Sequence, residues 1–156
     1  MNRVDELWAI EQIKQLKARY FRFADTRQDE SFLDLFTEEL EWILYSEDGT
    51  EVITQIRGKD QYRKWRASHR KTRLAGFSVH HGHMPEIEII DDDNARGIWA
   101  MMDYLRQPAK GKNYVGYGHY HEEYVRGLDG QWRIAKVKVT RLHVDPLGDQ
   151  ESSISS

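Results

Sequence analysis

The chain has 156 residues, enough for one domain with a core of ordinary size. Charged residues make up 31% of it and the net charge is -3, so no basic field is available to attract nucleic acid. Because the sequence contains no cysteine, disulfides, thiolate zinc sites and cysteine nucleophiles are excluded. The polar first residues do not resemble a signal peptide, and no segment approaches the roughly 18 consecutive apolar residues of a membrane span. We therefore expect a soluble, cytoplasmic protein that binds neither nucleic acid nor membranes.

The first half of the chain is predicted to hold three helices and a hairpin. Apolar residues recur every three to four positions from Val4 to Phe23, which is the period of an amphipathic helix. After a polar break, a second and short helix is expected over Glu30–Phe36. Alternating residues indicate a strand over Glu41–Tyr45, and a turn joins it to a strand over Glu51–Ile56. A third, very polar helix is predicted from Gly58 to about Lys71.

The second half is predicted to be almost entirely strand. Turn-forming residues separate long segments of strand composition, which are Phe77–Ile90, Ala95–Leu105, Tyr114–Arg126 and Trp132–His143. Helices followed by a long antiparallel meander describe an α+β domain, in which N-terminal helices pack on one face of a strongly curved, mostly antiparallel sheet. We expect this single domain to cover residues 1–145 and residues 146–156 to form a flexible tail.

A set of polar residues stands inside segments that otherwise have the composition of a core: Tyr20, Asp25, His80, Asp103 and Arg141. Burying one such group without a partner costs roughly 1–3 kcal/mol, and more if the group is charged. A small domain with several polar groups in its core must either pair these groups with one another or use them in binding or catalysis. A phenol, an imidazole, two carboxylates and a guanidinium are sufficient for acid–base chemistry on an organic molecule.

Each of these residues also has a purely structural interpretation. Asp25 alone could simply end the first helix, and Tyr20 alone could be a core aromatic residue with its hydroxyl at the rim. An inward-facing Asp103 near an inward-facing Arg141 could form a buried ion pair. The sequence leaves these alternatives open.

Strand alternation predicts which residues surround the polar set. Asp103 shares one apolar strand face with Trp99 and Met101, so it must be neutral, paired with a cation or facing a cavity. The same parity places four further side chains in that cavity as binding residues: Trp42, Trp99, Met101 and Tyr120.

Two pairs of histidines raise the question of a metal. His81 and His83 share a strand face, as do His119 and His121, and Glu122 and Glu123 follow directly. The spacing completes no recognised metal motif, so we expect neither a metal nor another cofactor. The four histidines have the parity opposite to the cavity, so the histidine pairs should face solvent or a contact between copies.

Two remaining patterns have simple interpretations. Gly116 and Gly118 alternate on one strand face and leave room for a ligand or another side chain. Basic residues crowd the third helix, at Arg63, Lys64, Arg66, Arg70, Lys71 and Arg73. They indicate a solvated face, or a patch that binds an anionic group of a substrate, such as a carboxylate or a coenzyme A phosphate.

Several segments together resemble the SnoaL-like branch of the nuclear transport factor 2-like superfamily. They are the helix ending 18–25, the 35–38 segment before Glu41 and Trp42, the strand of His80, and the terminal strand that begins at 130–134. The resemblance covers about Leu7 to Asp145. It implies a cone-shaped α+β barrel with a pocket between helices and curved sheet, and a homo-oligomer, dimer or trimer, formed through the outer face of the sheet.

Within that branch the site pattern is similar to that of bile acid 7α-dehydratases. The resemblance assigns the Tyr and Asp of helix one to Tyr20 and Asp25, the strand histidine to His80, the acid of the next strand to Asp103, and the last-strand arginine to Arg141. The Asp/His pair is also similar to the dyads of scytalone dehydratase and hexachlorocyclohexane dehydrochlorinase, which perform eliminations.

The resemblance therefore implies a cofactor-independent dehydratase that acts on a cyclic or polycyclic hydroxy-ketone, steroid-like or polyketide-like. Asp25 would orient His80 as the base, Tyr20 and Arg141 would bind the carbonyl oxygen, and Asp103 would hold a proton for the departing hydroxyl. Three alternatives stay open for the same pocket: an isomerase or cyclase, an epoxide hydrolase, and a small-molecule-binding module without catalysis.

Overall fold

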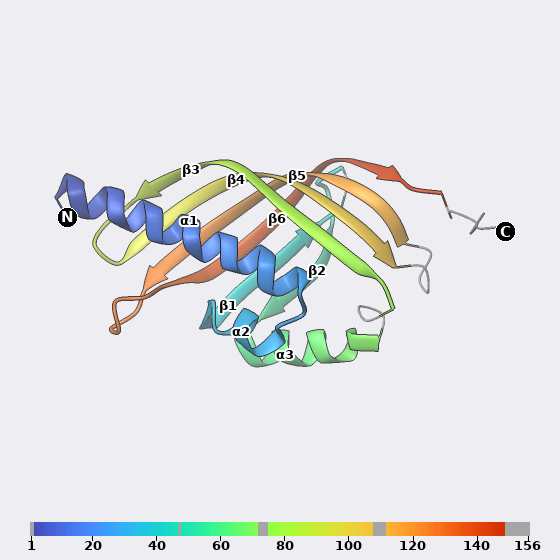
Figure 1. Ribbon diagram of the computed structural model, residues 1–156, viewed down its shortest axis with the longest axis horizontal. Coiled ribbons are helices and arrows are strands. Elements are labelled where there is room, and N and C mark those ends of the chain that lie inside the picture. The colour runs from blue at the N-terminus through green and yellow to red at the C-terminus, as the bar shows by residue number, and fades with distance from the viewer. Residues whose placement is uncertain (1, 47, 72–74, 108–111, 149–156) are drawn as a thin grey trace, which may run out of the picture.

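The computed structural model describes residues 2–46, 48–71, 75–107 and 112–148, and Figure 1 shows three helices beside one sheet. The helices are α1 (Arg3–Asp25), α2 (Asp29–Leu33) and α3 (Lys59–Ser68). The strands are β1 (Phe36–Tyr45), β2 (Val52–Arg57), β3 (Phe77–Ile89), β4 (Asn94–Gln107), β5 (Lys112–Arg126) and β6 (Trp132–Pro146).

The strands form one mixed sheet of six strands in the order β2-β1-β6-β5-β4-β3. Every neighbouring pair is antiparallel except β1 and β6, which run parallel. The mostly antiparallel, α+β architecture expected from the sequence is confirmed. The sheet curves strongly but does not close, because β2 and β3 are its two edges.

Helix α1 begins where Asn2 caps it, since the Asn2 side chain accepts hydrogen bonds from the backbone N–H groups of Val4 and Asp5. Its buried face carries Ala9, Ile13, Leu16, Lys17 and Tyr20, at the spacing of one helical stripe. The helix ends at Asp25, just before Arg27 takes a left-handed backbone conformation with φ of 59°. This ending places the Asp25 carboxylate beside the sheet.

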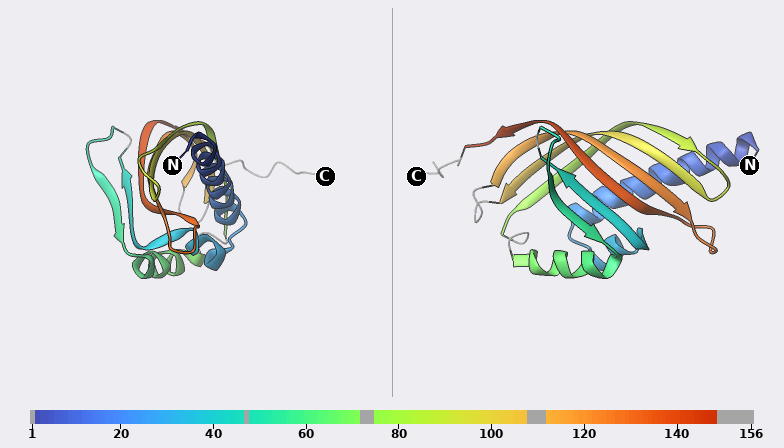
Figure 2. Two further views of the ribbon diagram at one scale, coloured as in Figure 1. Left: turned by 90° about the vertical axis from the view of Figure 1, so that its left-hand side faces the viewer. Right: turned by 180° about the vertical axis from the view of Figure 1, so that it is seen from behind.

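The helices cover one face of the sheet, as the sequence predicted. In Figures 1 and 2, α1 runs diagonally across the inside of the curve, and α2 and α3 lie together at the end of the sheet where β1 begins and β2 ends. The core fills the space between them and includes Phe36, Leu40, Ile134 and Val137, all with 0% exposure. None of the described helices combines the length and apolar character of a membrane span.

Element boundaries differ from the sequence-based predictions mainly in the second helix. That helix ends at Leu33, and Phe36 is already the first residue of β1. Phe36 is fully buried and pairs with Ile134 of β6, so tertiary pairing overrides its helical sequence context. Strand β6 extends to Pro146, and residues 149–156 of the predicted tail lie outside the described residues.

Candidate active site

A cavity of about 340 Å³ opens between the helices and the inner face of the sheet. Its wall includes one polar or aromatic side chain from each of several elements: Tyr20 of α1, Trp42 of β1, His80 of β3, Asp103 of β4, Tyr120 of β5 and Arg141 of β6. Helix α3 closes another side. The sequence-predicted polar residues therefore converge from distant parts of the chain. Asp25 lies directly behind the wall, in contact with His80.

The Asp25 carboxylate holds His80 at two points. Its Oδ1 lies 2.5 Å from Nδ1 of the imidazole, and its Oδ2 accepts the backbone N–H of His80 at 2.9 Å. The hydroxyl of Ser78 donates a further hydrogen bond to Oδ1 at 3.0 Å. Since a carboxylate accepts, we assign the proton to Nδ1, which leaves Nε2 for a ligand.

These contacts change the acidity of His80. Burial alone would lower the pKa of His80, but the hydrogen bond from the ring to Asp25 and the negative charges of Asp103 and Asp25 outweigh burial. The pKa of His80 is therefore raised above its ordinary value. The imidazole is a stronger base than a free histidine, with its orientation determined by Asp25.

Asp103 forms a buried ion pair with Arg141. Its Oδ2 accepts from Nη1 of Arg141 at 3.3 Å, and its Oδ1 accepts from the Tyr120 hydroxyl at 3.1 Å. The two partners therefore occupy both carboxylate oxygens. The ion pair that the sequence left open as an alternative is present.

Gly116 makes room for this ion pair. Asp103 of β4 is directly opposite Gly116 of β5, and a Cβ atom on Gly116 would come within 2.5 Å of Nη1 of Arg141. The guanidinium therefore lies over the glycine, with its carbon 5.9 Å from the centre of the Tyr114 ring. The sequence predicted that the space beside Gly116 would hold either a ligand or another side chain. The structure places the Arg141 side chain there.

The phenols of the cavity remain protonated. Burial raises the pKa of Tyr20 well above its ordinary value, and the neighbouring Tyr62, Glu122 and Asp103 act in the same direction. Burial likewise raises the pKa of Tyr120, with Asp103 as the next cause. Both hydroxyls are therefore protonated near neutral pH and can donate hydrogen bonds.

Opposite the polar groups the cavity has an aromatic wall. Trp42 stacks on Tyr62 with ring centres 5.8 Å apart, Tyr62 stacks on Trp65 at 5.9 Å, and Trp65 stacks on His69 at 4.5 Å. Tyr62 and Trp65 belong to α3, and His69 directly follows it. The polar third helix therefore directs its aromatic residues toward the cavity.

Two of the predicted cavity residues lie elsewhere. Trp99 and Met101 are buried, with 5% and 4% exposure, but they are not part of the cavity wall. The indole N–H of Trp99 donates to the Tyr124 hydroxyl at 2.8 Å, farther along the core. Parity correctly predicted an inward direction, but the position along the strand decides whether a side chain reaches the cavity or the packed core.

Sequence reasoning missed residues that the fold brings to the site. Arg66, predicted to belong to a solvated face or to a docking patch for an anion, is buried at 6% exposure, donates hydrogen bonds to Asp29 and lines the cavity. Glu122, considered beside the surface histidines, is also buried and bonds to Lys17. Helical spacing could have shown Lys17 on the stripe of Ile13 and Tyr20, and strand parity could have shown Glu122 on the face of Tyr120.

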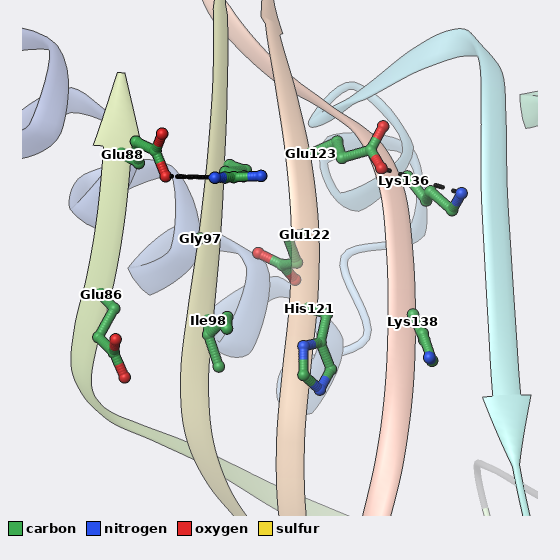
Figure 3. A pocket seen from close by; sticks show the side chains of 10 residues that line it. Glu86, Glu88, Gly97, Ile98, His121, Glu122, Glu123, Lys136 and Lys138 are labelled. Carbon is green, nitrogen blue, oxygen red and sulfur yellow. Dashed lines mark hydrogen bonds and ion pairs between the residues drawn. The ribbon is translucent and has the colours of Figure 1, made fainter. Parts of the chain in front are cut away.

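A second hollow of about 550 Å³ lies on the other face of the sheet, and Figure 3 shows it with α1 behind the strands. Glu86 and Glu88 on β3 form one side, Lys136 and Lys138 on β6 form the other, and His121 lies between them. The outward direction expected for His121 is thus observed. Within the described part of the chain, no group of three or more potential ligands is arranged to hold a metal.

Comparisons with known proteins agree with this architecture. The chain is 28% identical over 141 residues to a curated Gibberella zeae protein named "Probable cyclase FGR4", covering 84% of this chain and 89% of that one. A crystal structure of a candidate scytalone dehydratase from Novosphingobium aromaticivorans has a TM-score of 0.76 at 19% identity, covering 93% of this chain and 91% of that one.

The hexachlorocyclohexane dehydrochlorinase LinA-type3 from Novosphingobium barchaimii also has a TM-score of 0.76 at 19% identity, covering 95% of this chain and 96% of that one. At these identities the two structures establish the fold alone. The family described as SnoaL-like domain matches residues 5–138. The chain therefore belongs to the SnoaL-like domain family.

Proposed function

We propose that the protein is a cofactor-independent dehydratase that acts on a cyclic or polycyclic hydroxy-ketone, steroid-like or polyketide-like. The observation that carries this proposal is the 2.5 Å contact between Asp25 and His80 at the wall of the cavity. A base of raised pKa, neutral phenols and an aromatic wall are the groups that abstraction of a proton beside a ketone requires. The names of the structural neighbours, which include eliminating enzymes, support the same reaction class.

In the proposed reaction, Nε2 of His80 removes the proton from the carbon beside the ketone. The electron pair of the broken C–H bond moves onto the ketone oxygen, and the resulting enolate accepts a hydrogen bond from the Tyr20 hydroxyl. When the ketone re-forms, the carbon–oxygen bond at the neighbouring carbon breaks. The departing hydroxyl takes the proton from the His80 imidazolium and leaves as water, so the base returns to its starting state.

The Asp103–Arg141 pair has a supporting role in this proposal. Arg141 lines the cavity and keeps its charge balanced by Asp103, so the guanidinium can donate to a substrate oxygen without an unpaired charge in the site. Asp103 also holds the Tyr120 hydroxyl, which keeps that ring beside Tyr20. We assign the proton that leaves with the hydroxyl to His80 rather than to Asp103.

The test is turnover of a panel of hydroxy-ketosteroids and polyketide hydroxy-ketones, followed by mass spectrometry. His80→Ala should reduce turnover by about 10²- to 10⁴-fold, the usual contribution of a positioned base. His83→Gln is the matched control, because His83 is on the same strand but exposed on the other side of the sheet. Equal turnover by wild type and His80→Ala would exclude the dyad mechanism.

A cyclase is the second candidate, favoured by the similarity to the Gibberella zeae protein. The same base and donors would then generate an enolate whose carbon attacks a second carbonyl carbon of the substrate. The electron pair of that carbonyl moves onto its oxygen, and the resulting alkoxide takes the proton back from the His80 imidazolium. Product mass separates the outcomes, since dehydration removes one water, whereas isomerisation or ring closure by addition removes none. A protein that binds such ligands with unchanged affinity after His80→Ala and converts none of them would instead be a binding module.

We also propose that copies of the chain associate through the outer face of the sheet. The acidic side of the groove in Figure 3 is on β3 and the basic side is on β6, with two strands between them. A two-fold axis that lies between the two faces, parallel to the strands and midway between β4 and β5, would place Glu86 of one copy against Lys138 of the other. Glu86→Lys and Lys138→Glu should each weaken association in analytical ultracentrifugation, and the double variant should restore it.

A further inference from the structure

Behind the proposed active site lies a buried ion pair that the mechanism above does not use. Lys17 of α1 and Glu122 of β5 have side chains with 0% exposure, and Lys17 Nζ lies 2.5 Å from Glu122 Oε1. The other Glu122 oxygen accepts from the Tyr124 hydroxyl at 2.5 Å. A buried pair of this kind is weak evidence for stability, because apolar residues of similar volume often serve as well.

The surroundings of Lys17 connect it to the cavity. Its Nζ lies 3.6 Å from the centre of the Tyr120 ring and 4.1 Å from that of Tyr20, two rings of the cavity wall. These distances are those of cation–π contacts, which hold a ring and an ammonium in a defined arrangement. Tyr120 in turn donates its hydroxyl to Asp103. Lys17 thus supports, from behind, a ring whose other end holds an active-site carboxylate.

We propose that Lys17, held in place by Glu122, is a positioning residue of the active site, whose buried ammonium group holds the rings of Tyr20 and Tyr120 in the cavity wall. This inference rests on the proposed function for its role in turnover. The positive charge of Lys17 also opposes protonation of His80, so it partly offsets the effect of Asp25 on the base. Lys17 thereby helps to set the pH above which His80 is neutral and able to accept a proton.

The electrostatic environment is consistent with this role. Burial lowers the pKa of Lys17, while Glu122 and Asp103 act to raise it. Lys17 in turn acts to lower the pKa of His80. The ionisable groups around Lys17 are Tyr20 on α1, His80 on β3, Asp103 on β4, and Tyr120, Glu122 and Tyr124 on β5. Arg141 on β6 faces Asp103 from the other side.

The experiment measures the His80 pKa directly, by NMR titration of histidine-labelled protein in which His80→Gln identifies the signal. In Lys17→Met/Glu122→Leu, both charges are replaced by apolar groups of similar size. We expect the pKa of His80 to rise by about 0.5 to 1 unit and the acid limb of turnover to move with it. Lys14→Met is the control, since it removes the same charge from an exposed position of the same helix.

An unchanged His80 titration in the folded double variant would overturn the proposal and leave the pair with a structural role only. If the apolar variant does not fold, Lys17→Gln/Glu122→Gln removes both charges while keeping a hydrogen bond between the positions, and the same criterion applies. The result is independent of the proposed function. Failure of His80→Ala to reduce turnover would remove the reaction, whereas the titration reports the coupling between Lys17 and His80 with no substrate present.

Discussion

Asp25 and His80 are 55 positions apart in the chain, yet both oxygens of the Asp25 carboxylate bind His80, one through the ring and one through the backbone. The backbone bond keeps β3 against the end of α1, and the ring bond determines which nitrogen faces the cavity. A single side chain therefore both attaches a helix to a strand and orients the proposed base. The consequences of this relationship can be measured.

Replacing Asp25 by Asn should shift the pH dependence of turnover to lower pH. The carboxylate raises the pKa of His80, so its removal lets burial lower that pKa, and the neutral base forms at a lower pH. Maximal turnover should nevertheless fall by about tenfold or more, because an amide does not enforce the productive tautomer. A pH–rate profile of kcat/KM checks both effects, and an acid limb that moves upward or stays in place would contradict the assignment.

Stability should depend on pH through the same contact. Folding raises the pKa of His80 above its value in the unfolded chain, about 6.5, so the folded state binds the proton more tightly. The added stability is fully present below the unfolded pKa and is lost as the pH rises through the folded pKa. Urea unfolding at a series of pH values should show this loss in the wild type and a smaller one in His80→Gln. Equal pH dependence in the two proteins would refute the linkage.

Gly116→Ala should separate Arg141 from Asp103. The new methyl group would collide with the flexible end of Arg141, which must then move away from the buried Asp103 carboxylate, while Tyr120 still donates to that carboxylate. We expect the free energy of unfolding to fall by about 1–3 kcal/mol and kcat/KM to fall by about 10- to 100-fold. Gly148→Ala is the control, since a Cβ there meets nothing within 4 Å.

Tyr20→Phe tests the proposed donor to the substrate oxygen. The ring remains in the core, so folding should be preserved, while turnover should fall by about 10²- to 10³-fold, the usual cost of one lost oxyanion donor. Because burial raises the pKa of Tyr20, this residue should contribute no basic limb to the pH profile of the wild type. Tyr117→Phe, which alters a phenol stacked on His143, should have wild-type activity.

The local pattern of the chain was sufficient for most of the fold. The apolar stripe of α1 and the alternation of β3 to β6 identify elements that form because their buried faces must pack, and the structure contains each of them. The parallel pairing of β1 with β6 was not predictable, because it joins segments about 95 residues apart and no turn chemistry encodes it.

For the candidate site, the sequence determined which polar residues enter the interior, because parity and helical spacing decide the direction of a side chain. Only the tertiary structure decided their partners. Asp103 became an ion-paired carboxylate because Arg141 crosses Gly116 to reach it, and Lys17 and Glu122 neutralise each other across two elements. Direction is a local property of the backbone, whereas charge pairing and depth in the core depend on how distant segments pack, which a linear pattern does not contain.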